Sequence, residues 1–318
     1  MSRSNQNHIF LYMEKPQKSL WDRVKRYKIL LMMAVPCMIW LFIFAYLPVW
    51  GWIMAFQDYN PGLGILKSPF AGLKHFRRFF RDPNFMQILR NTMAISSLNI
   101  ITHTIFPITF ALLLNEVMTI MYKRVIQTVS YLPHFISYVV VSNLFLTLLA
   151  PSGAANDLLV VLGIVEQPIF FFAKPKLFWF LVAGINIWKE CGWTAIIYLA
   201  AISSIDPQLY EAATIDGAGR WRKMWNITLS GIKPTIVVLL IMSIPDLLNA
   251  GFEPSFLLGN GVISDYSEVI DTYVYNRGIA KSMYSFATAV GLLRTAIGLI
   301  LIVGANKFAR SVSEYGIY

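Results

Sequence analysis

Charged side chains and cysteines are both scarce in this chain. Charged residues make up 14% of its 318 residues, whereas a soluble domain carries about 25%. The two cysteines, Cys37 and Cys191, have no CxxC spacing, so a disulfide framework and a zinc site of that type are excluded. The sequence also lacks GxxxxGK(S/T), HExxH and GxSxG, the motifs of a phosphate-binding loop, a zinc protease and a serine hydrolase. We therefore expect no resident metal or cofactor and no enzyme activity.

Apolar residues, 56% of the chain, are gathered into six long runs. Each run is close to or above the roughly 17–25 residues that cross hydrocarbon as a helix. Because backbone in lipid satisfies its hydrogen bonds within the protein, such runs predict helices. We predict an all-α membrane protein with six transmembrane helices in one domain, residues 29–306, between a polar segment, 1–28, and a tail, 307–318. The predicted spans are about 29–56, 91–114, 128–149, 177–201, 235–252 and 286–304.

Lysine and arginine predict the orientation of the chain, because they favour cytoplasmic loops. Seven of them precede the first run, so we place both termini in the cytoplasm. This orientation puts 15 basic residues inside and 10 outside, which is a weak bias. The net charge of +10 is spread between the apolar runs, so we expect anionic membrane lipids as partners and no nucleic acid.

The first outer loop holds six of the ten outer basic residues. Within it, "GLKHFRRFFRD" (72–82) places Leu73, Phe76 and Phe80 on one helical face. This pattern favours an amphipathic helix that lies in the lipid interface. A solvated basic loop is the alternative.

A short structured piece separates the fourth and fifth runs. Asp206 precedes Pro207, which is the order of an N-cap followed by proline at the first helical position. We predict a helix over 207–215 that Gly217 ends, and a second helix that starts near Arg220. One face of the second helix is expected to carry Trp221, Met224, Trp225 and Thr228. A helix this short needs packing, so it is either a surface helix between spans or a helix that lies in a groove of another protein.

The same piece resembles a known signature. "EAATIDGAG" (211–219), followed by "NITLSGIKP" (226–234), is similar to the EAA loop of ABC-importer permeases. The chain as a whole resembles the carbohydrate-importer branch, of the maltose type and more closely the LplB-like polysaccharide permeases. Ser230 departs from the pattern, because the family usually has proline there. Further matching stretches are "SPFAGLKHFRRFFRDPNFMQILRNT" (68–92), "AGINIWKECGW" (183–193) and "SEVIDTYVYNRGI" (267–279).

The resemblance implies the type I importer architecture in a bacterial cell membrane. In that family two permease subunits share one translocation path, an ABC ATPase dimer binds below, and an extracytoplasmic solute-binding protein docks outside. ATP and Mg are then bound by the partner ATPase, and the second permease is expected to be a different chain. The loop 206–234 is expected to hold the coupling helix that sits in the ATPase. The resemblance places at that contact Glu211, Ala212, Ala213, Asp216 and Gly217.

Four ionisable residues, Lys189, Glu190, Asp246 and Arg294, lie inside predicted spans. A charge within the bilayer is costly, so it is normally paired or turned to a polar interior, and it is a candidate for function. We favour pairing of Lys189 or Arg294 with Glu190 or Asp246 over direct contact with cargo. The run 235–252 is also interrupted by proline and glycine, as are helices that line transport cavities. The candidate pathway residues are Asn186, Trp188, Lys189, Asp246, Asn249 and Arg294.

These observations favour a permease subunit that forms half of the path of an ATP-driven, binding-protein-dependent importer of oligosaccharides or polysaccharide fragments. An ion-coupled secondary transporter, with the four intramembrane charges as its relay, is the alternative. A membrane-anchored assembly protein is a third interpretation. If Lys189 or Arg294 faces the path, a sugar that bears a carboxylate is expected to be preferred, because both cations bind carboxylates.

Overall fold

The computed structural model describes residues 27–312, and helices with their connecting turns make up this part of the chain. The described residues form no strand, and one isolated antiparallel bridge joins Gln57 to Phe70. The chain divides into two units, Met1–Ile53 and Met54–Tyr318, each of which is described by itself. The all-α prediction is confirmed. Most of the polar segment 1–28 lies outside the described residues.

One long apolar helix, Lys28–Phe56, accounts for the described part of the first unit and continues into the second. It matches the predicted span 29–56. The helix changes its hydrogen-bonding pattern near Pro48, which lacks the N–H that a regular helix uses. The successive parts are α2 (Lys28–Leu41), the π-helical turn η1 (Phe42–Tyr46) and the 3₁₀ segment η2 (Leu47–Phe56).

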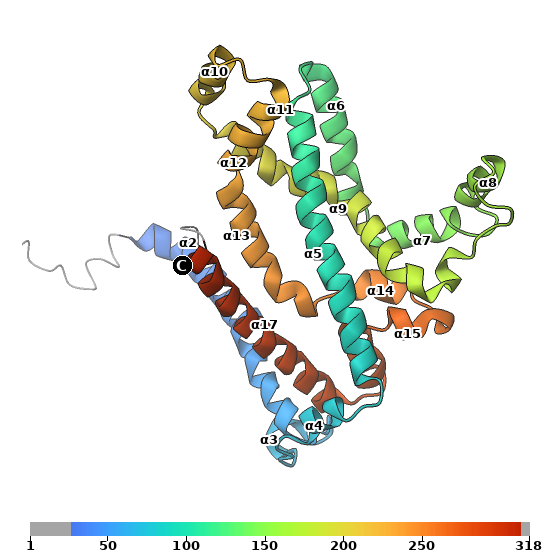
Figure 1. The fold of residues 1–318 in the computed structure, drawn as a ribbon. Coiled ribbons are helices and arrows are strands. Elements are labelled where there is room, and N and C mark those ends of the chain that lie inside the picture. Colours follow the sequence, from blue (N-terminus) through green and yellow to red (C-terminus); the bar gives the residue numbers. More distant parts are fainter. Residues whose placement is uncertain (1–26, 313–318) are drawn as a thin grey trace, which may run out of the picture. The chain divides into compact units, whose positions relative to one another are not determined.

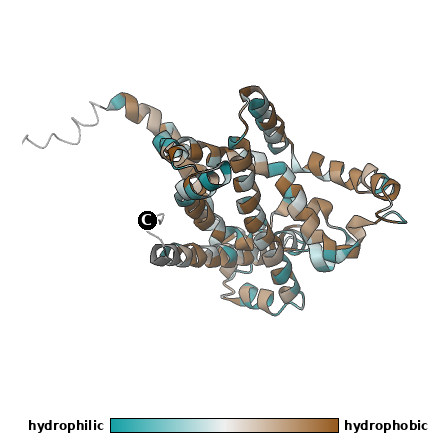
Figure 2. Ribbon diagram, turned by 45° about the horizontal axis from the view of Figure 1, so that its top comes forward, coloured by the Kyte–Doolittle hydropathy of each residue, from teal (hydrophilic) through white to brown (hydrophobic). Residues whose placement is uncertain are grey.

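Three long helices organise the second unit: α5 (Phe85–Asn115), α9 (Phe178–Ser203) and α17 (Tyr284–Val312). α5 and α9 pack along each other (Figure 1). Hydrophobic residues cover most of the long helices (Figure 2), as expected for helices that face lipid or one another. Among the described residues, three helices are long and apolar enough to cross a membrane, and two bent pairs raise the number to five. The count of six spans stays a prediction.

The predicted span 128–149 is not one straight helix. The chain turns by 103° between Ile120–Phe135 and Tyr138–Leu148. Ser137 begins the second helix as its N-cap and accepts a hydrogen bond from the Val140 N–H at 3.4 Å. The predicted span is thus divided into two helices, the second of which has its own N-cap. The elements are α6 (Ile120–Tyr131), the 3₁₀ turn η3 (Leu132–Phe135) and α7 (Tyr138–Leu148).

The run 235–252 is interrupted, as its proline and glycine predict. Pro245 lies in a 3₁₀ turn, and Gly251 takes a φ of 85° just before the next helix. Only glycine adopts such a backbone conformation readily. The elements are α13 (Lys233–Ser243), the 3₁₀ turn η7 (Ile244–Leu248) and α14 (Phe252–Leu258).

Short helices gather at the two ends of α5 (Figure 1). One end is near α10 (Pro207–Ile215) and α11 (Arg220–Lys223), and the other is near α4 (Lys74–Phe80). The helix predicted in "GLKHFRRFFRD" is therefore present as α4. Its buried residues are His75 and Phe79, however, whereas Leu73 and Phe80 are exposed. His75 and Phe79 pack on the chain itself, which leaves Leu73 and Phe80 free to meet lipid; the interfacial position of the helix stays a prediction.

The remaining short elements connect these parts. They are α3 (Gly64–Lys67), α8 (Ala154–Val161), η4 (Phe171–Ala173), η5 (Pro175–Leu177), η6 (Met224–Thr228), α12 (Leu229–Gly231), η8 (Gly261–Ile263), α15 (Ser264–Ser267), α16 (Ile270–Tyr273) and η9 (Val274–Ile279).

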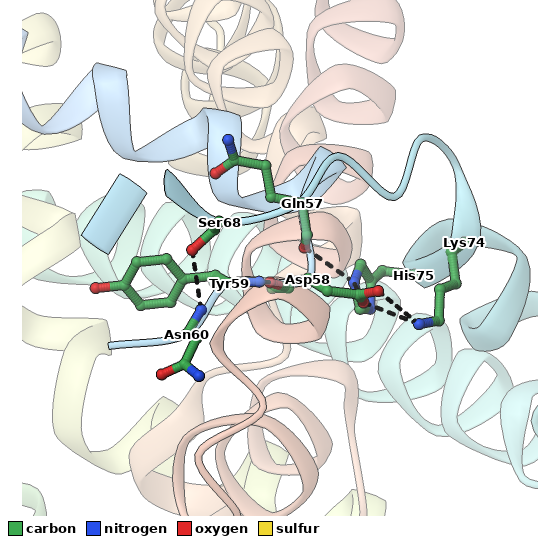
Figure 3. Close-up of polar contacts among 8 residues, drawn as sticks. Gln57, Asp58, Tyr59, Asn60, Ser68, Lys74 and His75 are labelled. Atoms are coloured by element: carbon green, nitrogen blue, oxygen red, sulfur yellow. Dashed lines mark hydrogen bonds and ion pairs between the residues drawn. The ribbon is translucent and has the colours of Figure 1, made fainter. Parts of the chain in front are cut away.

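A polar cluster ties the segment after the first long helix to α4 (Figure 3). Lys74 Nζ bonds both carboxylate oxygens of Asp58, at 2.9 and 2.8 Å. His75 Nε2 lies 3.1 Å from the Gln57 carbonyl oxygen and 3.1 Å from Asp58 Oδ1. The hydrogen bonds from Lys74 hold the pKa of Asp58 below its ordinary value. Tyr59 N–H donates to the Ser285 hydroxyl at 2.9 Å, so the cluster also fixes the start of α17.

Three buried apolar clusters hold the second unit together. The cluster nearest α10 joins side chains of α5 and α9 to Met224 and Ile232. The α9 helix also approaches α6 closely at Gly192, where an added Cβ would lie 2.1 Å from the Ser130 carbonyl oxygen. Only glycine allows this backbone contact, because any side chain would force the two helices apart.

Gly192→Ala is expected to destabilise the protein by about 1–3 kcal/mol, since the added methyl group meets backbone that cannot move aside alone. Gly184→Ala is a matched control in the same helix, because nothing lies within 4 Å of its added Cβ. Thermal unfolding of the detergent-purified protein measures both variants. An equal effect of the two substitutions would show that the Gly192 contact does not limit packing.

Candidate functional site

A polar cavity of about 350 Å³ lies beside the break between η7 and α14. Its size falls within the range of small-molecule sites, about 300–1,000 Å³. None of its lining residues is lysine or arginine. The lining residues are Ser96, Asn99, Ile100, His103, Tyr138, Asn186, Ser243, Asp246, Asn249, Ala250, Gly251, Phe252, Glu253 and Pro254.

Four segments that are distant in sequence supply the polar groups of the cavity. The long helices α5 and α9 contribute Asn99 and Asn186, and α7 contributes Tyr138 at its first position. The Tyr138 hydroxyl donates to Asn186 Oδ1 at 3.1 Å, and Asn186 Nδ2 donates to Asn99 Oδ1 at 3.1 Å. The turn η7 adds Asp246, and the break after it adds Asn249. Asn249 Nδ2 lies 3.4 Å from Asp246 Oδ1. A chain of amide, hydroxyl and carboxylate groups therefore runs along the cavity wall, among apolar residues such as Ile100 and Phe252.

Three of the six candidate pathway residues line this cavity: Asn186, Asp246 and Asn249. The other three do not. Trp188 is 41% exposed and packs edge-on against Phe145. Lys189 and Arg294 are both engaged in ion pairs.

Three further polar cavity residues that are not among the candidate pathway residues lie on α5. Ser96, Asn99 and His103 follow one another at i, i+3 and i+7, so they share one helical face. Tyr138 and Glu253 carried no such signal. They reach the cavity because each follows a break in the helical chain.

The two cations predicted to be paired are paired, although one partner differs from the expected one. Lys189 Nζ lies 3.1 Å from Glu190 Oε1. Arg294 forms an ion pair with Asp271 of α16, a residue of the loop between the fifth and sixth runs. Asp246, the other expected partner, instead faces the cavity. Burial brings Asp271 beside α17, which its position in the sequence did not indicate.

The loop 206–234 has the local structure that its residues predict. Asp206 caps α10 by accepting a hydrogen bond from the Gln208 N–H at 2.9 Å. Gly217 has a φ of 73°. Its N–H bonds the Thr214 carbonyl at 3.1 Å, and the Ala218 N–H bonds the Ala213 carbonyl at 2.8 Å. These two bonds form a Schellman motif, which needs a residue with positive φ at the position of Gly217.

Two side-chain hydrogen bonds join α10 to the helix that follows. The Tyr210 hydroxyl lies 3.0 Å from Thr228 Oγ1, and Lys223 Nζ donates to Thr214 Oγ1 at 2.6 Å. Ser230 lies in α12 beside Gly231, whose added Cβ would meet Ile205 Cδ1 at 2.6 Å. Gly231 therefore packs closely against Ile205. This contact lies next to Ser230, the position at which the family usually has proline.

Only two of the four residues predicted to share the apolar face of the second helix are buried. Met224 and Thr228 are buried, but Trp221 and Trp225 are 75% and 64% exposed. The π-helical turn η6 shifts the register within this stretch. In α10 itself no residue is buried, and the proposed contact residues Glu211, Ala212, Asp216 and Gly217 are exposed.

Comparison with known proteins identifies relatives over nearly the whole chain. The chain is 45% identical over 309 residues to the polygalacturonan/rhamnogalacturonan transport system permease protein YteP of Bacillus subtilis, covering 97% of this chain and 96% of that protein. It is 43% identical to protein LplB of the same organism, covering 93% and 92% of the two chains.

A solved structure and a family description agree with these relatives. A chain of a bacterial alginate ABC transporter, crystallised with an alginate pentasaccharide-bound periplasmic protein, matches with a TM-score of 0.85 and 38% identity over 94% of this chain and 99% of that chain. Residues 104–314 match the family described as binding-protein-dependent transport system inner membrane component. This chain belongs to that family of ABC transporter permeases.

Proposed function

We propose that this protein forms half of the translocation path of an ATP-driven importer of oligosaccharides. The observation that carries the proposal is the polar cavity, which lies beside a broken helix within an otherwise apolar bundle. Non-helical backbone at membrane depth is tolerated where it lines a cavity, and transporter sites are commonly built there. Amides, hydroxyls and carboxylates are suitable partners for the hydroxyl groups of a sugar.

The names of the relatives point to acidic polysaccharide fragments as the cargo. YteP is named for polygalacturonan and rhamnogalacturonan, and the solved transporter carries alginate. We propose that this chain passes oligosaccharides of the same acidic class. Its own cavity wall carries Asp246 and Glu253 and no lysine or arginine, so the cationic groups that neutralise the cargo belong to the second permease or the binding protein. Lys189 and Arg294, which were expected to favour a sugar that bears a carboxylate, are paired within the protein and do not line the cavity.

An ion relay through the four intramembrane charges is not supported. Arg294 is paired with Asp271 and Lys189 with Glu190, while Asp246 lies on the cavity. The charges therefore belong to separate local contacts. The relatives are components of ABC transport systems, which take their energy from a separate ATPase.

The geometry of α10 favours contact with that ATPase. The helix has nine residues, none of them buried. Such a short helix is marginal in water without packing, and here its own chain provides two hydrogen bonds and a capped turn. We propose that Glu211, Ala212, Ala213, Asp216 and Gly217 contact the ATPase, which places the loop 206–234 and both termini in the cytoplasm. The second permease and the solute-binding protein complete the transporter.

A reconstituted transporter tests the function directly. In proteoliposomes that contain the second permease, the ATPase and the binding protein, uptake of trigalacturonic acid is expected to require ATP and to persist in the presence of a protonophore. A neutral galactose trisaccharide of equal length should be imported more slowly. Uptake that continues without ATP but stops when the proton gradient is removed would contradict the proposal.

Gly217→Pro is expected to abolish the stimulation of ATP hydrolysis by loaded binding protein. Proline cannot adopt a positive φ and has no N–H for the Thr214 carbonyl, so the turn after α10 is lost. Gly217→Ala is the graded control: nothing lies within 4 Å of its Cβ, and the left-handed conformation costs only about 1–2 kcal/mol. It should retain partial stimulation. Normal stimulation in the proline variant would remove the coupling role from this turn.

Arg294→Gln should reduce the import of acidic and neutral sugars equally. The change leaves the partly buried Asp271 carboxylate without its cation, which is expected to cost roughly 1–3 kcal/mol of stability. Less protein should reach the membrane, as quantitative immunoblotting measures. The double variant Arg294→Gln/Asp271→Asn removes both charges and should recover much of that loss. A selective loss of acidic-sugar uptake in the single variant would instead place Arg294 on the path.

A further inference from the structure

The sharp corner before α7 is held by α9. The corner consists of Ile136 and Ser137, and helix ends of this kind leave carbonyl groups without helical partners. One such carbonyl, that of His134, accepts a hydrogen bond from Lys189 Nζ at 2.6 Å. A buried side chain of the neighbouring helix thus satisfies the backbone two residues before the corner.

The next residue of α9 holds the side chain of the same histidine. Glu190 Oε2 lies 2.6 Å from His134 Nδ1. The imidazole ring is stacked on Trp193, with ring centroids 4.4 Å apart and planes inclined by 1°. Two consecutive residues, together with Trp193, therefore fix both the backbone and the ring of His134.

Lys189 does not itself face the cavity. Its side chain is 6% exposed, and its ammonium group lies 3.1 Å from Glu190 Oε1 and 5.0 Å from the centre of the Tyr138 ring. A carboxylate, a carbonyl and an aromatic face together compensate a cation that has lost its water. The charge is thus fully engaged within the protein.

The corner determines where Tyr138 points. Tyr138 is the first residue after the corner, and its hydroxyl reaches into the cavity wall, where it donates to Asn186 Oδ1 at 3.1 Å. We propose that Lys189 and Glu190 are positioning residues, which pin His134 so that the corner presents Tyr138 to the passing cargo. This inference rests on the proposed function, because it takes the cavity as part of the path.

Cargo imported per ATP hydrolysed is the quantity that tests the inference. It is measured in proteoliposomes with the complete transporter at saturating loaded binding protein. Tyr138→Phe removes the hydroxyl alone and is expected to lower this ratio roughly fivefold, the size of an ordinary side-chain coupling. Lys189→Met should lower it by a similar factor. The variant with both changes should be no worse than either single one, because both remove the same contact.

Three further variants distinguish a loss of positioning from a loss of folding. Lys189→Met/Glu190→Gln removes both charges and leaves no unpaired carboxylate in the interior, so it is expected to fold and still show the lowered ratio. Lys189→Arg keeps a cation and should restore part of the ratio. Lys176→Met replaces an exposed lysine just before α9 and should change nothing. A purely structural defect lowers the amount of protein, and with it uptake and ATP hydrolysis in proportion, which leaves the ratio unchanged.

The possible results separate the two claims. If Tyr138→Phe leaves the ratio unchanged, the Tyr138 hydroxyl does not meet the cargo and the positioning role is overturned, whereas loss of ATP-dependent uptake by the unaltered transporter would instead contradict the proposed function. If Tyr138→Phe lowers the ratio but its effect multiplies with that of Lys189→Met, the two residues act independently and the positioning role is overturned. An unchanged ratio in the variant that lacks both charges would also overturn it.

Discussion

Backbone that leaves the helical conformation inside an apolar protein has to find its hydrogen-bond partners within the protein, and the functional part of this permease depends on that constraint. Two of the breaks between helices border the cavity, at Ile136–Ser137 and at Asn249–Gly251. At the first break Lys189 Nζ donates a hydrogen bond to the His134 carbonyl. At the second, the Asn249 N–H bonds the Asp246 carbonyl at 2.7 Å. Both breaks border the same cavity. The positions at which the helical conformation ends therefore also provide polar groups to the cavity wall.

The long helix α9 joins the cavity to the proposed ATPase contact. It carries Asn186 in the cavity wall, and it ends at Ser203, three residues before the N-cap of α10. On the other side of the loop, α13 leads from the same region to the second helix break. We infer that a movement of α10 is transmitted to the cavity through both helices, because a packed helix moves as a rigid element.

Ion pairs in this protein secure local structure and leave the cavity without a free cation. Lys189 and Arg294 each form an ion pair with a carboxylate of this chain. The carboxylates that remain on the cavity, Asp246 and Glu253, can accept hydrogen bonds from sugar hydroxyls. The proposed two-subunit path permits a division in which this wall recognises hydroxyl groups and the other components meet the charge of the proposed acidic cargo.

The class of the protein and its local motifs follow from the order of its residues. Long apolar runs predict membrane helices because lipid offers no hydrogen-bond partners, and Asp206, Pro207 and Gly217 define α10 because capping depends on adjacent residues alone. The interruption of the run 235–252 follows in the same way from Pro245 and Gly251. These predictions rest on interactions between neighbours in the chain, which a sequence displays directly.

Which polar residues meet depends on how the helices pack. Pro133 and Ser137 mark the corner at Ile136–Ser137 locally, but Lys189 and Glu190, which hold it, come from another helix. For the same reason the pairing predicted for Lys189 or Arg294 does not include Asp271, which reaches Arg294 through the packing of α16 against α17. Tyr138 and Glu253 join the cavity through the two breaks. The direction of the chain after a break depends on long-range packing, and residue order does not specify it.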